Sequence, residues 1–196
     1  MRKNIILMIL FTLHCSLLTS AWAAGQGGQL FDTLKSGVGA RALGMGGAYT
    51  AISDNADAPF WNPAGLASIA KSEITTSQTR MSTDADHYYL SFVSPLKKGS
   101  FGLSWIQVGT GNLLHTASQV DSYNEVQTLG TFSYYSNAML LSYGVNLTNK
   151  VAAGITAKYL SAAMEVSADG KASGYSITPG VLLKASERFT LGLKVD

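Results

Sequence analysis

The chain has 196 residues and a formal net charge of +2, with 46% of its residues hydrophobic and 13% charged. This length suits one domain, and so little charge is unusual for a soluble protein of this size. The sequence contains no cluster of basic residues, which argues against a nucleic acid partner. Its hydrophobic residues lie in short runs rich in tyrosine, phenylalanine, valine, leucine and glycine, which favour strands over helices.

The N-terminus has the pattern of a cleavable signal peptide. Arg2 and Lys3 precede an apolar run from Ile5 to Leu18, and Ala21-Trp22-Ala23 follows with small residues where a signal peptidase cuts. A membrane anchor is the alternative, but the run is short for a span of about 20 residues. We therefore expect residues 1–23 to be removed on export, which leaves equal numbers of basic and acidic residues.

The stretch from Gly37 to Ala67 is rich in glycine and alanine and precedes every strand-like run. Small side chains remove little apolar area from water, so this stretch cannot build a core of its own. Glycine also permits positive φ, and Asn62-Pro63 and Gly65 interrupt the chain with turns. We therefore predict that residues 24–71 form an irregular plug, or hatch, held inside a larger structure.

After this stretch the sequence alternates between apolar and polar residues, which is the period of β-strands. From Val151 to Tyr159, for example, valine, isoleucine and tyrosine alternate with glycine, threonine and lysine. Seven such runs are expected, and every second connection between them is tight, as in outer-membrane barrels. The predicted connections are Ser82–Asp86, Leu96–Gly99, Thr110–Ser136, Thr148–Asn149, Ser167–Ser173 and Ala185–Arg188.

The alternation predicts an all-β fold, in which residues 72–196 form part of a transmembrane antiparallel β-barrel. The apolar side of each strand would face lipid, and the small and polar side would face the lumen. A β-sandwich shows the same alternation, so a soluble periplasmic β-protein is an alternative. Aromatic residues that could lie at the membrane interfaces are Tyr88, Trp105, Tyr143, Tyr159 and Tyr175.

The glycine-rich stretch also carries a resemblance to a known family. Gly39-Ala40-Arg41-Ala42, Gly44-Met45-Gly46-Gly47-Ala48 and Asn62-Pro63-Ala64-Gly65-Leu66-Ala67 resemble the N-terminal motif of the PorV/PorQ family of FadL-type outer-membrane barrels. A weaker similarity extends through Leu141-Ser142-Tyr143-Gly144 to Lys158-Tyr159. The resemblance implies a fourteen-stranded barrel with an N-terminal hatch in its lumen. The seven strands would then be an N-terminal half or a truncated member.

FadL-type relatives pass long-chain fatty acids or other hydrophobic molecules, whereas PorV-type relatives serve protein secretion and surface attachment. We therefore expect a non-enzymatic channel for hydrophobic small molecules in the cell outer membrane, in contact with its lipid. The alternative is a barrel that assists secretion or surface attachment, with secretion-machinery proteins as partners. No cofactor, catalytic residue or metal site is expected, because His87 and His115 lack further ligands and should be solvated.

The candidate functional residues lie mainly in the hatch motif. Arg41, Asp54 and Asp57 could form an ion-pair set that latches the hatch, or could be ordinary structural pairs. Pro179 removes a hydrogen-bond donor from a strand, so it marks a kink or lateral opening, an edge position or a bulge. The full hatch set is Gly39, Arg41, Gly44, Gly46, Gly47, Asp54, Asp57, Asn62, Pro63 and Gly65.

Three of these glycines, Gly44, Gly46 and Gly47, lie together where few large side chains occur. We expect them to adopt positive φ or to touch the barrel wall. A valine at Gly46 would then meet both backbone strain and steric overlap.

Overall fold

The computed structural model describes residues 32–81, 84–120, 125–165 and 170–196. The predicted signal peptide, residues 1–23, and the first part of the predicted plug, residues 24–31, lie outside the described residues. Within the described ranges, no helix is long and apolar enough to cross a membrane.

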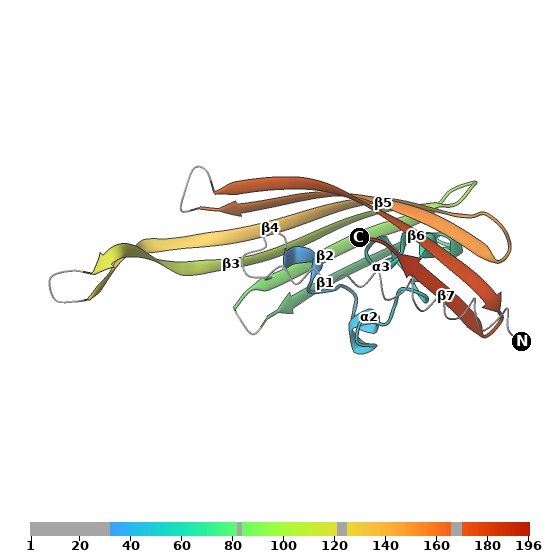
Figure 1. The fold of residues 1–196 in the computed structure, drawn as a ribbon, viewed down its shortest axis with the longest axis horizontal. Coiled ribbons are helices and arrows are strands. Elements are labelled where there is room, and N and C mark those ends of the chain that lie inside the picture. The colour runs from blue at the N-terminus through green and yellow to red at the C-terminus, as the bar shows by residue number, and fades with distance from the viewer. Residues whose placement is uncertain (1–31, 82–83, 121–124, 166–169) are drawn as a thin grey trace, which may run out of the picture.

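Seven strands form one antiparallel sheet in which each strand pairs with its neighbours in the sequence, in the order β1 to β7. The sheet curls like one side of a barrel, as Figure 1 shows. The predicted all-β, antiparallel architecture is therefore confirmed. The strands are β1 (Glu73–Arg80), β2 (Asp86–Pro95), β3 (Ser100–Val120), β4 (Val126–Asn146), β5 (Val151–Met164), β6 (Lys171–Ser186) and β7 (Phe189–Lys194).

Strands β3 and β4 are longer than predicted, with 21 residues each. Most of the predicted connection Thr110–Ser136 is a two-stranded ribbon that projects past the neighbouring strands (Figure 1). The register between the two strands shifts at Thr110/Leu113, His115/Thr116 and Thr116/Val120. Bulges of this kind break the alternation of side chains, so the pattern of period two could not reveal this part of the hairpin.

The contrast between short and long connections is therefore smaller than expected. The connections lie at the two ends of the strands, which we call the two edges of the sheet. The tight connections of the sequence prediction recur at one edge as residues 96–99, 147–150 and 187–188, and connections 81–85, 121–125 and 165–170 lie at the other. The two edges of the sheet differ mainly because the ribbon of β3 and β4 extends one of them.

The N-terminal segment, which we define as residues 37–69, contains only short helices. They are α2 (Ala40–Gly44), α3 (Ala58–Trp61) and η2 (Pro63–Ser68), preceded by η1 (Asp32–Leu34). Glycine and proline keep them short: Asn62 turns to extended backbone after α3, and Pro63 starts η2. Helices α3 and η2 lie against the concave face of the sheet, whereas α2 lies clear of it (Figure 1).

The two faces of the sheet differ as predicted. In β5 and β6, buried and exposed positions alternate along most of each strand. The concave face carries small or polar residues such as Thr156 and Thr178, which are fully buried. The convex face exposes large apolar side chains, which include Leu103, Met139, Leu141, Ile155, Ile177, Val181, Leu183, Leu191 and Leu193.

The five aromatic residues predicted for the interfaces all lie on the convex face, because each alternates with buried neighbours or lies on an exposed position of its strand. Tyr175 is 83% exposed, and its ring centroid lies 5.1 Å from that of Tyr159 on the adjacent strand. His87 departs from its prediction. The sequence suggested a solvated side chain, but His87 faces inward and is 3% exposed.

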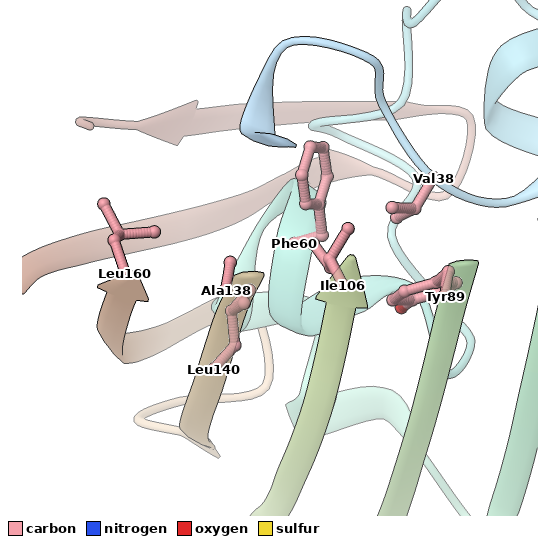
Figure 2. Close-up of a cluster of buried hydrophobic side chains, with 7 residues drawn as sticks. All are labelled: Val38, Phe60, Tyr89, Ile106, Ala138, Leu140 and Leu160. Carbon is pink, nitrogen blue, oxygen red and sulfur yellow. The ribbon is translucent and has the colours of Figure 1, made fainter. Parts of the chain in front are cut away.

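The hydrophobic core lies between the N-terminal segment and the concave face. Figure 2 shows Phe60 of α3 and Val38 packed against side chains of four strands. We call the seven-stranded sheet the wall, and every wall side chain in this cluster comes from a concave-face position. The cluster consists of Val38, Phe60, Tyr89, Ile106, Ala138, Leu140 and Leu160. The core therefore needs both the N-terminal segment and the sheet.

Pro179 lies in β6, between β5 and β7, and no register shift occurs where it pairs with Ile155. The structure therefore excludes a bulge, and the β7 side of Pro179 lies just before the ladder begins, which fits the predicted edge position. Its carbonyl accepts a hydrogen bond from the N–H of Val195 at 3.1 Å. The N–H and C=O of one residue point to the same neighbour in an antiparallel strand, so the missing donor faces the end of β7. The ladder with β7 starts at Gly180, so Pro179 lies directly beside its first pair.

Candidate functional site

The candidate site is the surface where the N-terminal segment lies on the concave face. Its centre is a row of three glycines in register: Gly144 of β4 pairs with Gly154 of β5, which pairs with Gly180 of β6. The chain at Asn62 and Pro63 crosses directly over this row. A Cβ atom on Gly154 would lie 2.3 Å from the carbonyl carbon of Pro63, and one on Gly180 would lie 2.2 Å from Oδ1 of Asn62.

Two more wall glycines extend this surface. A Cβ atom on Gly102 of β3 would lie 2.7 Å from Cγ of Pro59, and one on Gly192 of β7 would lie 2.5 Å from the carbonyl oxygen of Thr50. Only glycine leaves room for atoms of the segment to lie so close to the backbone of the strands. We call the five residues Gly102, Gly144, Gly154, Gly180 and Gly192 the glycine seat. The sequence predicted a plug beside the small and polar face of the strands, but it could not show which glycines of the strands contact it.

Asn62 fixes the N-terminal segment on this seat. Its side chain is fully buried, and Nδ2 donates to the carbonyls of Thr50 at 2.9 Å and of Val181 in β6 at 3.2 Å. Its Oδ1 accepts from the backbone N–H of Ala64 at 3.1 Å. Asn62 therefore joins two parts of the segment to the wall and also starts helix η2. Of the predicted hatch residues, Asn62 and Pro63 have the most direct contact with the sheet.

Wall side chains supply donors for carbonyls of the segment that have no helix or sheet partner. Ser91 donates to the carbonyl of Ala56 at 2.7 Å, and Thr156 donates to that of Pro59 at 3.0 Å. Lys194 and Asn146 do the same for Phe60 at 3.2 Å and Ala67 at 2.8 Å. Buried backbone carbonyls need such partners, so the polar residues of the concave face match this irregular segment.

Within the segment, the predicted glycines fall into two groups. A Cβ atom on Gly39 would lie 2.1 Å from Oδ2 of Asp57, and one on Gly65 would lie 1.7 Å from the carbonyl oxygen of Ser53. Gly47 has positive φ and lies against the ring of Trp61. Gly44 and Gly46, by contrast, have open space where a Cβ atom would be. The predicted overlap at Gly46 is therefore wrong, although its φ of +64° retains the predicted strain.

The predicted set of three charges is only partly formed. Arg41 Nη1 lies 2.7 Å from Asp54 Oδ1, with the two side chains 52% and 50% exposed. The hydroxyl of Tyr49 also contacts Asp54, at 3.2 Å. Burial, followed by the nearby carboxylate of Asp54, raises the pKa of Tyr49 to about 12. An ion pair this exposed contributes about 1 kcal/mol or less to stability.

Asp57 is not part of this pair. It is 3% exposed, its Oδ2 accepts from Nδ2 of Asn55 at 3.0 Å, and its Oδ1 has no hydrogen-bond partner among the described residues. Burial raises the pKa of Asp57, although hydrogen bonds from Asn55 and Tyr89 partly oppose this shift.

The raised pKa gives a pH-dependent contribution to stability. Because the folded state holds the proton of Asp57 more tightly than the unfolded state, the protonated form stabilises the fold. This contribution is complete below the ordinary pKa of an aspartate and is lost as the pH rises through the raised pKa. We expect Asp57→Asn to remove this part of the pH dependence. Urea unfolding with Trp105 replaced by phenylalanine, followed by Trp61 fluorescence over a pH series, would measure it, and an unchanged pH profile would contradict it.

Two lysines of the sheet, Lys158 of β5 and Lys194 of β7, lie on the concave face next to this site. Both contact the carboxylate of Asp196, and Thr178 donates to the same carboxylate at 2.8 Å. The side chain of Lys158 is 4% exposed, so its charge is balanced where it is buried.

Three aromatic residues of the segment were missed by sequence reasoning. Tyr49 is fully buried, and its ring lies edge-on to Trp61 with centroids 6.2 Å apart. Trp61 also contacts Phe60 and donates from Nε1 to the carbonyl of Val38 at 2.9 Å. Large aromatic residues in a stretch of small ones were the available signal, since they are the side chains that can bury most area.

A cleft of about 530 Å³ lies between the segment and strands β6 and β7. Its lining includes Ile52, Asp54, Leu182, Arg188 and Phe189. No group of three histidine, cysteine, aspartate or glutamate residues in the described ranges could hold a metal ion. In comparisons with known proteins, no family model, curated protein or solved structure matches the chain.

Proposed function

We propose that the chain forms a wall and a hatch of an outer-membrane β-barrel that passes hydrophobic small molecules. The observation that supports this most is the opposite character of the two faces. The convex face exposes apolar side chains over strands β2 to β7. The concave face carries many small and polar residues, with apolar ones where the core packs, and holds the N-terminal segment. Lipid accepts the first face, and a lumen accepts the second.

The N-terminal segment suits a hatch because it rests on the wall through glycine contacts and hydrogen bonds to carbonyls. Beside the cluster of Figure 2, two smaller apolar clusters join the segment to the sheet, one with Leu66, Ile69 and Val93 and one with Ala64 and Leu182. The cleft between the segment and strands β6 and β7 offers a path with an apolar lining from Ile52, Leu182 and Phe189. Passage would proceed where the hatch and the wall meet.

A second candidate is the secretion-associated barrel, with protein partners. The ribbon of β3 and β4 favours it, because the ribbon extends past the other strands and exposes Leu114, Val126 and Leu129 at 66%, 63% and 61%. Exposed apolar residues on a projecting element suit contact with another protein.

The experiment compares cells with and without the complete gene. If the protein passes hydrophobic molecules, its deletion should slow the uptake of a labelled aromatic hydrocarbon, and the gene supplied in trans should restore it. The surface proteome should stay unchanged. Loss of surface proteins with normal uptake would favour the secretion-associated barrel, and recovery of the protein in the soluble periplasmic fraction would refute both.

A further inference from the structure

Basic side chains that are far apart in the sequence lie together at one edge of the sheet, where the strands end in the connections 96–99, 147–150 and 187–188. The register shows this: Pro95 pairs with Ser100, Ser100 with Gly144, and Gly144 with Gly154. Strand β6 ends beside β5 in the same way, because the N–H of Lys184 donates to the carbonyl of Lys150. Connections 96–99, 147–150 and 187–188 therefore share this edge.

This edge carries six exposed basic residues and two acidic ones, Glu73 and Glu187. None of the six forms an ion pair with any described residue. Their charges are therefore available to an external partner. We call them the basic rim: Lys71, Lys97, Lys98, Lys150, Lys184 and Arg188.

The opposite edge has the reverse charge. Its described acidic residues are Asp84, Asp86, Glu125 and Glu165, against Arg80 and Lys171. Arg80 lies 3.6 Å from Asp86, so one of these two cations is already paired. The numbers of basic and acidic residues are thus nearly equal in the whole chain, but the two kinds lie mainly at opposite ends of the strands. The sequence alone could not show it, because it depends on which connections share an edge.

The basic rim adjoins exposed apolar residues of the same connections. Leu96 precedes Lys97 and is 53% exposed, Leu147 precedes Lys150 and is 62% exposed, and Phe189 follows Arg188 and is 56% exposed. This order suits a membrane interface, where apolar side chains reach the acyl chains and lysine and arginine extend to the phosphates.

We propose that the basic rim binds the phosphate groups of anionic phospholipids and so holds this edge of the sheet at one leaflet. The inference rests on the proposed membrane wall, because the rim borders the apolar face that would lie in lipid. The acidic edge would be repelled by the same headgroups. The rim therefore gives the sheet a preferred direction across the bilayer.

The test uses the full protein, purified in zwitterionic detergent and diluted into preformed vesicles. One set of vesicles consists of phosphatidylcholine alone, and in the other set part of the phosphatidylcholine is replaced by phosphatidylglycerol. Flotation measures the bound fraction. Lys97→Gln with Lys98→Gln should weaken binding to the anionic vesicles by roughly tenfold or more at low salt, since each lysine near an anionic surface contributes about fivefold. Added salt should remove the difference.

The matched control is Arg80→Gln with Lys171→Gln, which removes the same charge from the opposite edge. It should bind the anionic vesicles like the unmodified protein. An equal loss in both double variants would show an effect of net charge alone and would overturn the rim. Equal binding of the unmodified protein to both kinds of vesicle would also overturn it. Binding to neither kind of vesicle would refute the proposal that the sheet forms part of a membrane barrel.

Discussion

Gly154→Val should dislodge the N-terminal segment from the sheet while the strands remain paired. The new Cβ atom would lie 2.3 Å from the carbonyl carbon of Pro63 and 2.4 Å from the backbone nitrogen of Ala64. Backbone atoms cannot rotate away as a side chain can, so one chain must move off the other. We expect a cost of about 3 kcal/mol or more, at the upper end of overpacked cores. With Trp105 replaced by phenylalanine, Trp61 fluorescence should shift to the red as its ring leaves the buried cluster.

The control is Ala157→Val in the same strand, on the exposed convex face. It adds the same side chain where no segment lies, and valine is favoured in strands. Heat-modifiable gel migration should be the same for both variants if the sheet is intact. Normal Trp61 fluorescence and normal protease resistance of the segment in Gly154→Val would show that the glycine seat does not hold it.

The strand pattern was predictable because each strand has two unlike faces. Small or polar residues such as Gly154 and Thr156 alternate with Ile155 and Ala157 in the sequence, and the sheet keeps them on opposite sides. The same logic failed beyond Thr110, where bulges displace side chains from the regular period. Bulges depend on the partner strand, and a single strand does not report them.

The site was predictable in part, and there is a physical reason why some of its residues could be predicted and others could not. Asn62, Pro63, Gly39 and Gly65 stand out because their backbone demands are local, and the structure gives each a tight contact. Asp57 resembled its neighbour Asp54 in sequence, yet one is buried and the other is half exposed. That difference arises from how the segment folds back on itself, which composition does not encode.

The contacts of the N-terminal segment suggest why its residues are small. The wall supplies glycines below it and hydroxyl or amide donors for its carbonyls, so the backbone itself is the surface that is recognised. Ser91, Thr156 and Asn146 act on carbonyls rather than on side chains. Such a surface tolerates changes in exposed side chains, such as Leu43, but not the addition of atoms near the backbone.

The sharpest test of this principle is Gly65→Ala, which adds a single methyl group. That group would lie 1.7 Å from the carbonyl oxygen of Ser53 and 2.9 Å from its Cβ. Real Cβ atoms do not approach a backbone oxygen so closely, so the turn after Tyr49 and helix η2 must separate. We expect a loss of about 3 kcal/mol in the stability of the segment, with impaired assembly of the complete barrel.

Gly44→Ala is the matched control, because the same methyl group there meets open space in a helix, where alanine is favoured over glycine. Both variants would be studied with Trp105 replaced by phenylalanine, so that Trp61 alone reports on the segment after removal of the predicted signal peptide. Gly65→Ala should unfold at lower urea and conduct small ions more freely in planar bilayers, whereas Gly44→Ala should do neither. If Gly65→Ala matches Gly44→Ala in both measurements, the segment is not packed backbone against backbone, and a hatch held in this way is refuted.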